Sequence, residues 1–233
     1  MHLEPVRWED DWPVIGEAGP GVTTGEPVTT GPVPDHKGRS SDQCPQTSDE
    51  FNGSALGPQW EWNHNPDDDH WTLRERPGFL RLKPMPASDL FHARNTLTQM
   101  VQDDAFELTA KLDLTHIKDG DHTGLAMFEK NASGLEIVQE HGTRNLHFWQ
   151  VSGSPDGNVT AVPIAESVQL RVRVQGDTAN YFYSTDEGKQ FQPLGPPATL
   201  TFRWWKGSRP SIFAFTTGTG AGSFVDVDWV RYP

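Results

Sequence analysis

The sequence has little cysteine, little basic charge and no long apolar run. Its one cysteine, Cys44, allows no internal disulfide, so the redox compartment is not encoded. It has 19 basic and 32 acidic residues, a formal net charge of −13, and lacks the basic stripe that phosphate backbones require. No apolar run approaches the roughly 18 residues of a membrane span. We therefore expect neither a nucleic-acid nor a membrane partner.

The first residues, Met1 to Pro5, contain neither a basic leader nor an apolar stretch. We therefore expect no signal peptide in the chain as given. A longer parent chain could carry such a signal, so secreted and cytoplasmic locations both stay open.

Glycine, proline and aromatic residues are abundant instead. The 22 Gly and 19 Pro, with only 4 Met, favour short strands and frequent turns over long helices. The 12 Phe and 9 Trp provide large side chains for a core. A chain of 233 residues is long enough for one large all-β domain, or for a domain with an arm.

Two parts are expected along the chain. Residues 1–16 are too short to fold alone and too apolar for a free tail, so they form either a packed arm or the end of another domain. Residues 17–47 are rich in Gly, Pro, Thr and Ser and have almost no apolar periodicity, which is typical of a linker or extended strap. We predict an arm and linker over 1–47 and a folded domain over 48–233.

Alternating apolar and polar residues predict strands throughout residues 48–233. The clearest are 106–114 and 168–174, the latter with arginines on its outer face, while the continuously apolar 124–128 fits a strand covered on both faces. Hairpin turns are expected at 76–78 and 186–188. Further strands are predicted at 72–75, 78–83, 135–138, 145–151, 181–184, 190–191, 211–215 and 224–230. About a dozen short strands, with only a short helical turn at 88–94, predict an all-β, two-sheet antiparallel sandwich.

A tryptophan-rich stretch, residues 59–71 (QWEWNHNPDDDHW), is the first candidate for a ligand site. Trp60 and Trp62 alternate with polar residues as in a strand with one aromatic face, and the second half is typical of a turn. Exposed rings stack on sugars, while amides, carboxylates and guanidinium groups bond sugar hydroxyls. The predicted carbohydrate-binding residues are Trp60, Trp62, Asn63, His64, Asn65, Asp67, Trp71, Arg94, Trp204 and Trp205. The alternative is packing between the sheets, which we expect for at least half of these tryptophans.

Catalytic signatures are weak. Glycoside hydrolysis needs two carboxylates on opposite sides of one bond, whereas the acidic residues here lie mostly at turns. These residues are Asp67, Asp68, Asp69, Asp103, Asp104, Asp119, Asp121, Asp186 and Glu187. The chain has no nucleophile elbow and no zinc spacing. The glycine-rich segment 218–222 precedes a strand and lacks the lysine of a phosphate loop.

Calcium is the one cofactor that the sequence suggests. Asp49 begins the predicted domain, and Asp226 and Asp228 lie on its last strand. If the terminal strands pair, these hard oxygen ligands could meet, and the predicted metal ligands are Asp49 and Asp228. The alternative is that the carboxylates protect an exposed edge strand against aggregation.

Four motifs resemble one known family. DEFNG (49–53), WEWNHNPD (60–67), ERPGFLRL (75–82) and VDVDWV (225–230) are similar to the C-terminal β-sandwich of glycoside hydrolase family 43 enzymes, in the same order, over residues 48–233. Residues 3–16 resemble the last segment of that family's five-bladed β-propeller. The resemblance implies a concanavalin A-like jelly roll attached to a β-xylosidase or α-L-arabinofuranosidase. Such modules are classed as xylan-binding, in family 91 of the carbohydrate-binding scheme.

The resemblance also places the catalytic carboxylates on the propeller, almost all of which is absent, so the chain alone is not expected to hydrolyse glycosides. In some relatives the loop before the last strand narrows the propeller's active site, and Phe213 and Phe215 lie nearest that loop here. Three hypotheses follow. The chain is an accessory domain binding xylan or arabinoxylan oligosaccharides, a free-standing hydrolase using Asp67, Asp69 or Glu75, or a structural domain completing a propeller active site. The expected partners are xylan-type carbohydrate and a family 43 propeller.

Overall fold

A computed structural model describes residues 4–19, 22, 25–31, 46–151 and 161–233. The chain divides into two compact units, Met1–Cys44 and Pro45–Pro233, and each is described by itself. Cys44 and most of the predicted linker lie outside the described residues. The described part consists of strands, turns and loops, and it contains no helix that could cross a membrane.

The N-terminal unit is organised by a β-hairpin. Strand β1 (Val6–Glu9) pairs antiparallel with β2 (Trp12–Ile15). The turn residues Asp10-Asp11 have positive φ angles of 48° and 61°, the left-handed conformation that tight hairpin turns require. Trp8 and Trp12 are exposed. The segment predicted as an arm thus contains a hairpin that displays two tryptophans.

The first sheet of the sandwich has eight strands in the order β12-β11-β10-β9-β17-β7-β3, with β6 paired to β17. The β6–β17 pairing is parallel and all others are antiparallel. The strands are β3 (Trp60–Trp62), β6 (Met85–Pro86), β7 (Asn95–Gln99), β9 (Asp121–Phe128), β10 (Ser133–Glu140), β11 (Thr143–Gln150), β12 (Val162–Pro163) and β17 (Arg209–Thr216).

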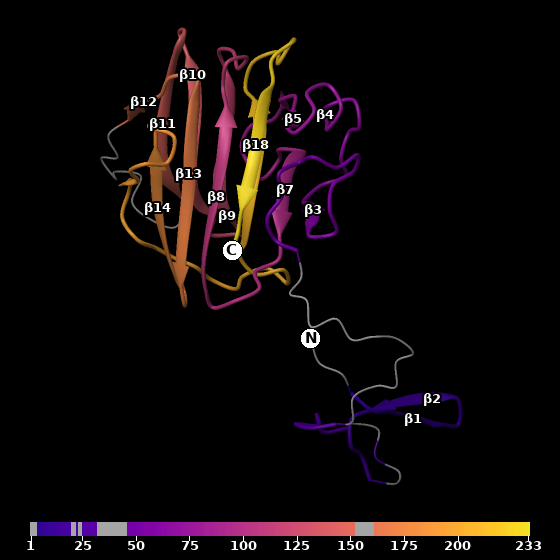
Figure 1. Cartoon of the computed structure of the whole chain (residues 1–233). Helices are drawn as coiled ribbons and strands as arrows, with labels where there is room; N and C mark the ends of the chain where they lie inside the picture. The colour runs from indigo at the N-terminus through magenta and orange to yellow at the C-terminus, as the bar shows by residue number, and fades with distance from the viewer. Residues whose placement is uncertain (1–3, 20–21, 23–24, 32–45, 152–160) are drawn as a thin grey trace. The chain divides into compact units, whose positions relative to one another are not determined.

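The second sheet also has eight strands, in the order β15-β14-β13-β8-β18-β5-β4, with β16 paired to β14. All its pairings are antiparallel. The strands are β4 (Trp71–Thr72), β5 (Leu80–Leu82), β8 (Ala105–Asp113), β13 (Ser167–Gln175), β14 (Thr178–Ser184), β15 (Gln192–Pro193), β16 (Ala198–Thr199) and β18 (Val225–Arg231). Figure 1 shows this layer packed face to face with the first sheet. The predicted all-β sandwich is confirmed.

The core lies between the sheets because apolar residues alternate along each strand. On β13, Val168, Leu170, Val172 and Val174 are buried in it. Fully burying such a side chain stabilises the fold by about 1.5–3 kcal/mol. Strand β9 is covered on both faces: Leu125 and Met127 join this core, and Ala126 and Phe128 join a second cluster on the outer face of the first sheet. The prediction for 124–128 is therefore confirmed.

The hairpins form where the sequence predicts them, with shorter strands. Gly78, at φ +82°, turns the chain between β4 and β5, and Gly188, at φ +81°, turns it between β14 and β15. The strand predicted over 72–75 ends at Thr72, because the Arg74 amide donates to the Thr72 hydroxyl instead of a partner strand. The strand predicted over 190–191 begins only at Gln192. In both places a local hydrogen bond competes with the ladder.

The segment 88–94 is a turn, as predicted. The His92 amide donates to the Asp89 carbonyl and the Ala93 amide to the Leu90 carbonyl, both at 3.2 Å. This turn lies on the outer face of the first sheet, where Leu90, Phe91 and Ala93 join the second apolar cluster.

Candidate functional site

The two tryptophans of β3 pack against the core. Trp60 and Trp62 are half-buried against it, whereas Glu61 between them is exposed. The Trp60 ring stacks on Phe51 with 5.9 Å between centroids, and its Nε1 donates to Asp49 Oδ2 at 2.8 Å. Both rings therefore pack on the core, as the alternative to ligand contact expects, and their contact with a ligand stays a prediction.

The polar half of the tryptophan-rich stretch is bound to the 88–94 turn. His64 Nε2 donates to the Phe91 carbonyl at 2.8 Å, and Arg94 donates to the carbonyls of Asn65 and Pro66 at 3.1 and 3.2 Å. His70 Nδ1 lies 3.3 Å from Asp67 Oδ1, the Asp69 amide donates to the same oxygen at 3.2 Å, and both contacts lower the pKa of Asp67. Trp71 packs beside Trp62, with ring centroids 5.3 Å apart. The structure brings these predicted residues together, with His64 and Arg94 donating to protein carbonyls and Trp71 Nε1 donating to Asp68 Oδ1 at 3.1 Å.

The remaining predicted tryptophans, Trp204 and Trp205, lie on the loop between β16 and β17 and differ in exposure. The Trp204 ring packs on Phe91 and Phe128, at 6.0 and 5.5 Å between centroids. Trp205 is 81% exposed, and nearby Phe202 is 75% exposed. This loop displays an uncovered aromatic surface.

Glu61 attaches that loop to the first sheet. Lys206 Nζ donates to Glu61 Oε1 at 2.7 Å, and Arg209 Nη1 binds Glu61 Oε2. Hydrogen bonds from Lys206 and then Arg209 lower the pKa of the Glu61 carboxyl. Trp205 is thereby displayed from an anchored loop, with Lys206 Nζ 5.2 Å from its ring centroid.

Two of the hollows in the described part of the sandwich combine room for a small ligand with aromatic lining residues that carry a polar neighbour. The first, which we name the edge hollow, has a volume of about 490 Å³ beside β3. It is lined by Gln46, Pro58, Gln59, Trp60, Glu61, Met100 and Gln102. Three amides and the Glu61 carboxylate line it beside Pro58, Met100 and the half-buried Trp60, so its exposed lining is more apolar than polar. It contains one of the predicted site residues, Trp60.

The second, which we name the aromatic hollow, has a volume of about 340 Å³ on the outer face of the first sheet. Its lining residues are Ser88, Asp89, Leu90, Phe91, His122, Glu136, Trp149, Val151 and Phe215. None of these residues is among the carbohydrate-binding residues predicted from the sequence. The signal was present on β11, where Leu146 and Phe148 point into the core and Trp149 therefore points outward.

The carboxylates named for a free-standing hydrolase are engaged elsewhere. Lys83 Nζ donates to Glu75 Oε1 at 2.6 Å and Arg81 to Glu75 Oε2 at 3.1 Å, and Lys83 is the main group that lowers the pKa of Glu75. A general acid at neutral pH needs a raised pKa instead. Asp69 donates its amide to Asp67 within the turn. This geometry favours structural roles for these acidic residues.

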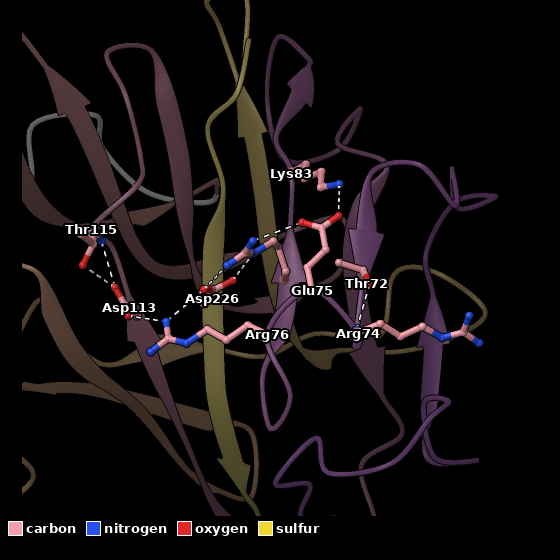
Figure 2. A network of polar contacts seen from close by, with 9 residues as sticks. Thr72, Arg74, Glu75, Arg76, Lys83, Asp113, Thr115 and Asp226 are labelled. Atoms are coloured by element: carbon pink, nitrogen blue, oxygen red, sulfur yellow. Dashed lines mark hydrogen bonds and ion pairs between the residues drawn. The ribbon is translucent and has the colours of Figure 1, made fainter.

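Glu75 belongs to an ionic network on the outer face of the second sheet, shown in Figure 2. At its centre, Asp226 is only 1% exposed and accepts two hydrogen bonds from Arg81, at 2.7 and 2.9 Å. Arg76 Nη1 donates to Asp226 at 3.0 Å and to Asp113 at 2.6 Å. We name these five residues, Glu75, Arg76, Arg81, Asp113 and Asp226, the Asp226 network. It joins β5, β8 and β18 and leaves Asp226 fully compensated.

The predicted calcium ligands also have protein partners. The terminal strands do pair, since the backbones of Asp49 and Val230 exchange two hydrogen bonds of 2.8 Å. The Asp49 carboxylate accepts from the Phe51 amide and Trp60, and Asp228 faces Lys111 at 3.2 Å. Within the described residues, no group of three His, Cys, Asp or Glu side chains could hold a metal. Calcium at Asp49 and Asp228 stays a prediction, which thermal melting after dialysis against EDTA would test.

The fold defines the class of this protein: a concanavalin A-like β-sandwich. The family model of the beta-xylosidase C-terminal concanavalin A-like domain, from glycoside hydrolase family 43, matches residues 48–233. The chain belongs to this family, as its motifs predicted.

The relatives are longer than this chain. A beta-xylosidase from Formosa agariphila is 35% identical over 256 residues, covering 99% of this chain and 42% of the relative. An alpha-L-arabinofuranosidase from Bacteroides ovatus is 29% identical, covering 61% of this chain and 26% of that enzyme. The solved structure of an engineered GH43 hydrolase with endo-xylanase and exo-arabinofuranosidase activity matches with a TM-score of 0.75 at 26% identity, over 99% of this chain and 48% of that one. The chain thus spans less than half the length of these relatives.

Proposed function

We propose that this chain is the accessory sandwich of a hemicellulose-degrading family 43 enzyme and that it binds xylan- or arabinoxylan-type oligosaccharides. One observation carries the proposal. The family domain matches continuously over residues 48–233, while the chain covers only 42% of a relative named as a beta-xylosidase. The substrates of such enzymes are therefore the ligands to test.

The geometry supports binding more than catalysis. Each of the two hollows combines aromatic side chains with amide, hydroxyl or carboxylate groups, the mixture that sugars require. The carboxylates Asp67 and Glu75 have lowered pKa values, which suits ionic contacts rather than proton donation.

Calorimetric titration of the 233-residue chain with xylohexaose tests the proposal. We expect measurable heat and a change in tryptophan fluorescence, because nine tryptophans report on ligand contact. Maltohexaose, with a different linkage and backbone shape, is the control and should give neither. Absence of heat and of a fluorescence change with millimolar xylohexaose would contradict the proposal.

The same protein should not hydrolyse aryl-xylosides or aryl-arabinosides. Turnover by the purified chain, abolished by Asp67→Asn, Asp69→Asn or Glu75→Gln, would instead support the free-standing hydrolase.

A second function, completion of a propeller active site, is favoured by a different observation. Phe202 and Trp205 are the large exposed aromatic side chains of the described sandwich, and they lie on one loop anchored through Glu61. Such an exposed apolar pair fits a protein interface. A family 43 propeller supplied in trans should then co-purify with the chain and gain activity. The double variant Phe202→Ala/Trp205→Ala should lose both effects, and an unchanged yield of complex would contradict this role.

A further inference from the structure

We infer that the aromatic hollow on the outer face of the first sheet binds a ring of a neutral sugar chain. The inference rests on the proposed function, that the domain binds oligosaccharide, and adds the location and the charge class of the ligand. Five observations carry it: the walls of the hollow, the close spacing of the strands beside it, an unsatisfied donor, its charge and its size.

Three aromatic residues form the walls. Trp149 comes from β11, Phe215 from β17 and Phe91 from the 88–94 turn. Their positions are fixed independently of any ligand. His122 stacks on Phe215, with ring centroids 4.5 Å apart and an angle of 11° between planes, and Phe91 packs on Phe128 at 5.6 Å. Phe215 is only 3% exposed, so the partly buried rings of Trp149 and Phe91 are the ones that offer apolar faces, at little entropic cost because they are already packed.

Two buried glycines lie on the same face of the sheet as these walls. Gly134 is the cross-strand partner of Trp149, and Gly124 is the partner of Glu136. Since Leu125 and Leu135 point into the core, their neighbours Gly124 and Gly134 take outward positions. A Cβ at Gly124 would lie 2.0 Å from the Leu135 carbonyl oxygen, so the close approach of β9 and β10 requires glycine there.

The indole nitrogen of Trp149 lacks an acceptor. Trp149 Nε1 is buried and has no hydrogen-bond partner among the described residues. A buried donor without a partner costs about 1–3 kcal/mol. A ligand oxygen entering the hollow would satisfy it, as a sugar hydroxyl or ring oxygen can.

The charge of the hollow selects against anions. Asp89 and Glu136 line it, and no Lys or Arg is among its described lining residues. His122 Nδ1 donates to Glu136 Oε1 at 3.0 Å, which orients that carboxylate. Burial favours the neutral form of Asp89, but hydrogen bonds from His92 and Ser88 outweigh this and lower its pKa. Charged carboxylates accept hydrogen bonds from sugar hydroxyls and repel uronates and phosphates.

A cationic ligand is the main rival, because aromatic rings beside carboxylates also attract alkylammonium groups. The sugar is favoured by Trp149 Nε1, since an alkylammonium offers no acceptor to that donor. The volume of about 340 Å³ lies at the lower end of the roughly 300–1,000 Å³ of small-molecule sites, which fits a short segment of a sugar chain.

The test is calorimetric titration of the whole chain and its variants with xylohexaose. Trp149→Ala, which removes both ring and donor, should weaken binding by about tenfold or more. Trp149→Phe, which keeps a ring and removes only the donor, should weaken it by a smaller factor. Gln102→Ala tests the rival location in the edge hollow. The matched control is Phe191→Ala, an aromatic side chain that packs against Arg171 and lines neither hollow, and it should bind within about twofold of wild type.

The outcomes separate the two proposals. No binding by the wild-type chain would overturn both the site and the proposed function. Normal binding by the folded Trp149 variants together with loss in Gln102→Ala would overturn the site and leave the proposed function standing. Tighter binding of choline or of a glucuronic-acid-substituted xylo-oligosaccharide than of xylohexaose would overturn the neutral-sugar assignment. Near-ultraviolet circular dichroism checks folding, and Trp149→Phe, the milder change, carries the test if Trp149→Ala unfolds.

Discussion

The outer faces of the two sheets differ in chemistry although their inner faces share one core. The second sheet presents ion pairs: the Asp226 network, Lys111 with Asp228, and Arg171 and Arg173 with Glu107. The first sheet presents an aromatic cluster that includes Phe128, Phe213, Phe215 and Trp149. One face thus consists of compensated charges, and the other of rings that only partly cover one another.

This difference shows where ligand chemistry is available. On the second sheet, charged donors and acceptors are satisfied by each other, and Arg81 and Arg171 also lie over aromatic rings, at 3.6 and 3.5 Å from their centroids. A ligand there would have to break existing contacts. On the first sheet, the 88–94 turn and Trp204 cover only part of the aromatic face and leave the aromatic hollow beside them.

Breaking the charged face should have the largest effect. Asp226→Ala leaves Arg81, whose side chain is only 14% exposed, without its main partner. Removing one member of a buried ion pair costs about 3–5 kcal/mol. Urea unfolding followed by tryptophan fluorescence measures this loss. The control Arg173→Ala removes a half-exposed pair and should cost less than about 1 kcal/mol. Equal losses in the two variants would show that the Asp226 network does not hold the strands together.

On the aromatic face, Gly124→Ala should cost about 1–3 kcal/mol, because β9 and β10 must separate to admit the methyl group. The unfolding midpoint in urea gives the value. In the control Gly57→Ala, the new Cβ meets only the Gln59 side chain, which can rotate away, and a change within about 1 kcal/mol is expected. If Gly124→Ala leaves the free energy of unfolding unchanged, β9 and β10 can separate at a lower cost than the contact with the Leu135 carbonyl oxygen indicates.

The charged face should also make the sandwich sensitive to acid. Burial favours the neutral form of Asp113, but hydrogen bonds from Arg76 and Thr115 outweigh it and lower its pKa below 3.8. As the pH falls, the Asp113 carboxyl is therefore protonated in the unfolded chain before it is protonated in the folded one. Its stabilisation is complete above about pH 5 and is lost progressively as the pH falls below the pKa that this carboxyl has in the unfolded chain. Between pH 5 and 3, the free energy of unfolding should fall less steeply with decreasing pH in Asp113→Asn and Arg76→Gln than in wild type. Parallel slopes in all three proteins would argue against this contribution.

The smallest effect on stability is expected at the exposed loop. Trp205→Ala removes a ring that is 81% exposed, and its stability should stay within about 0.5 kcal/mol of wild type. Trp204→Ala is the matched comparison and should cost clearly more, because that ring packs on Phe91 and Phe128. Thermal melting distinguishes the two. A large loss in Trp205→Ala would place its ring in a contact with other parts of the chain.

Much of the fold could be predicted because its signals are local. Strand β13 alternates apolar and polar residues, which places its arginines outside, and the glycines of the two hairpins mark their turns. The ends of β4 and β15 were less predictable, since they depend on single side-chain hydrogen bonds such as Thr72 to the Arg74 amide.

The candidate site was harder to predict because it depends on register between distant strands. His122, Glu136, Trp149 and Phe215 come from four different strands and meet only because β9 pairs with both β10 and β17, and β10 pairs with β11. No local pattern fixes that register. The tryptophan-rich stretch was predicted to be a ligand site because of its composition, but Trp60 and Trp62 pack largely against the core. Alternation along a strand decides which of its side chains share a face, but the partner strands and their register decide which residues of different strands meet there.

The position of the last two strands has a consequence for biosynthesis. β17 lies between β9 and β7 in the first sheet, and β18 lies between β8 and β5 in the second, as Figure 1 shows for β18. These central strands are the last of the sandwich to be synthesised, so until Arg209 and the residues after it have left the ribosome, both layers remain split with open edges. Neither sheet can therefore close before that point, and the incomplete sandwich exposes strand edges that favour aggregation.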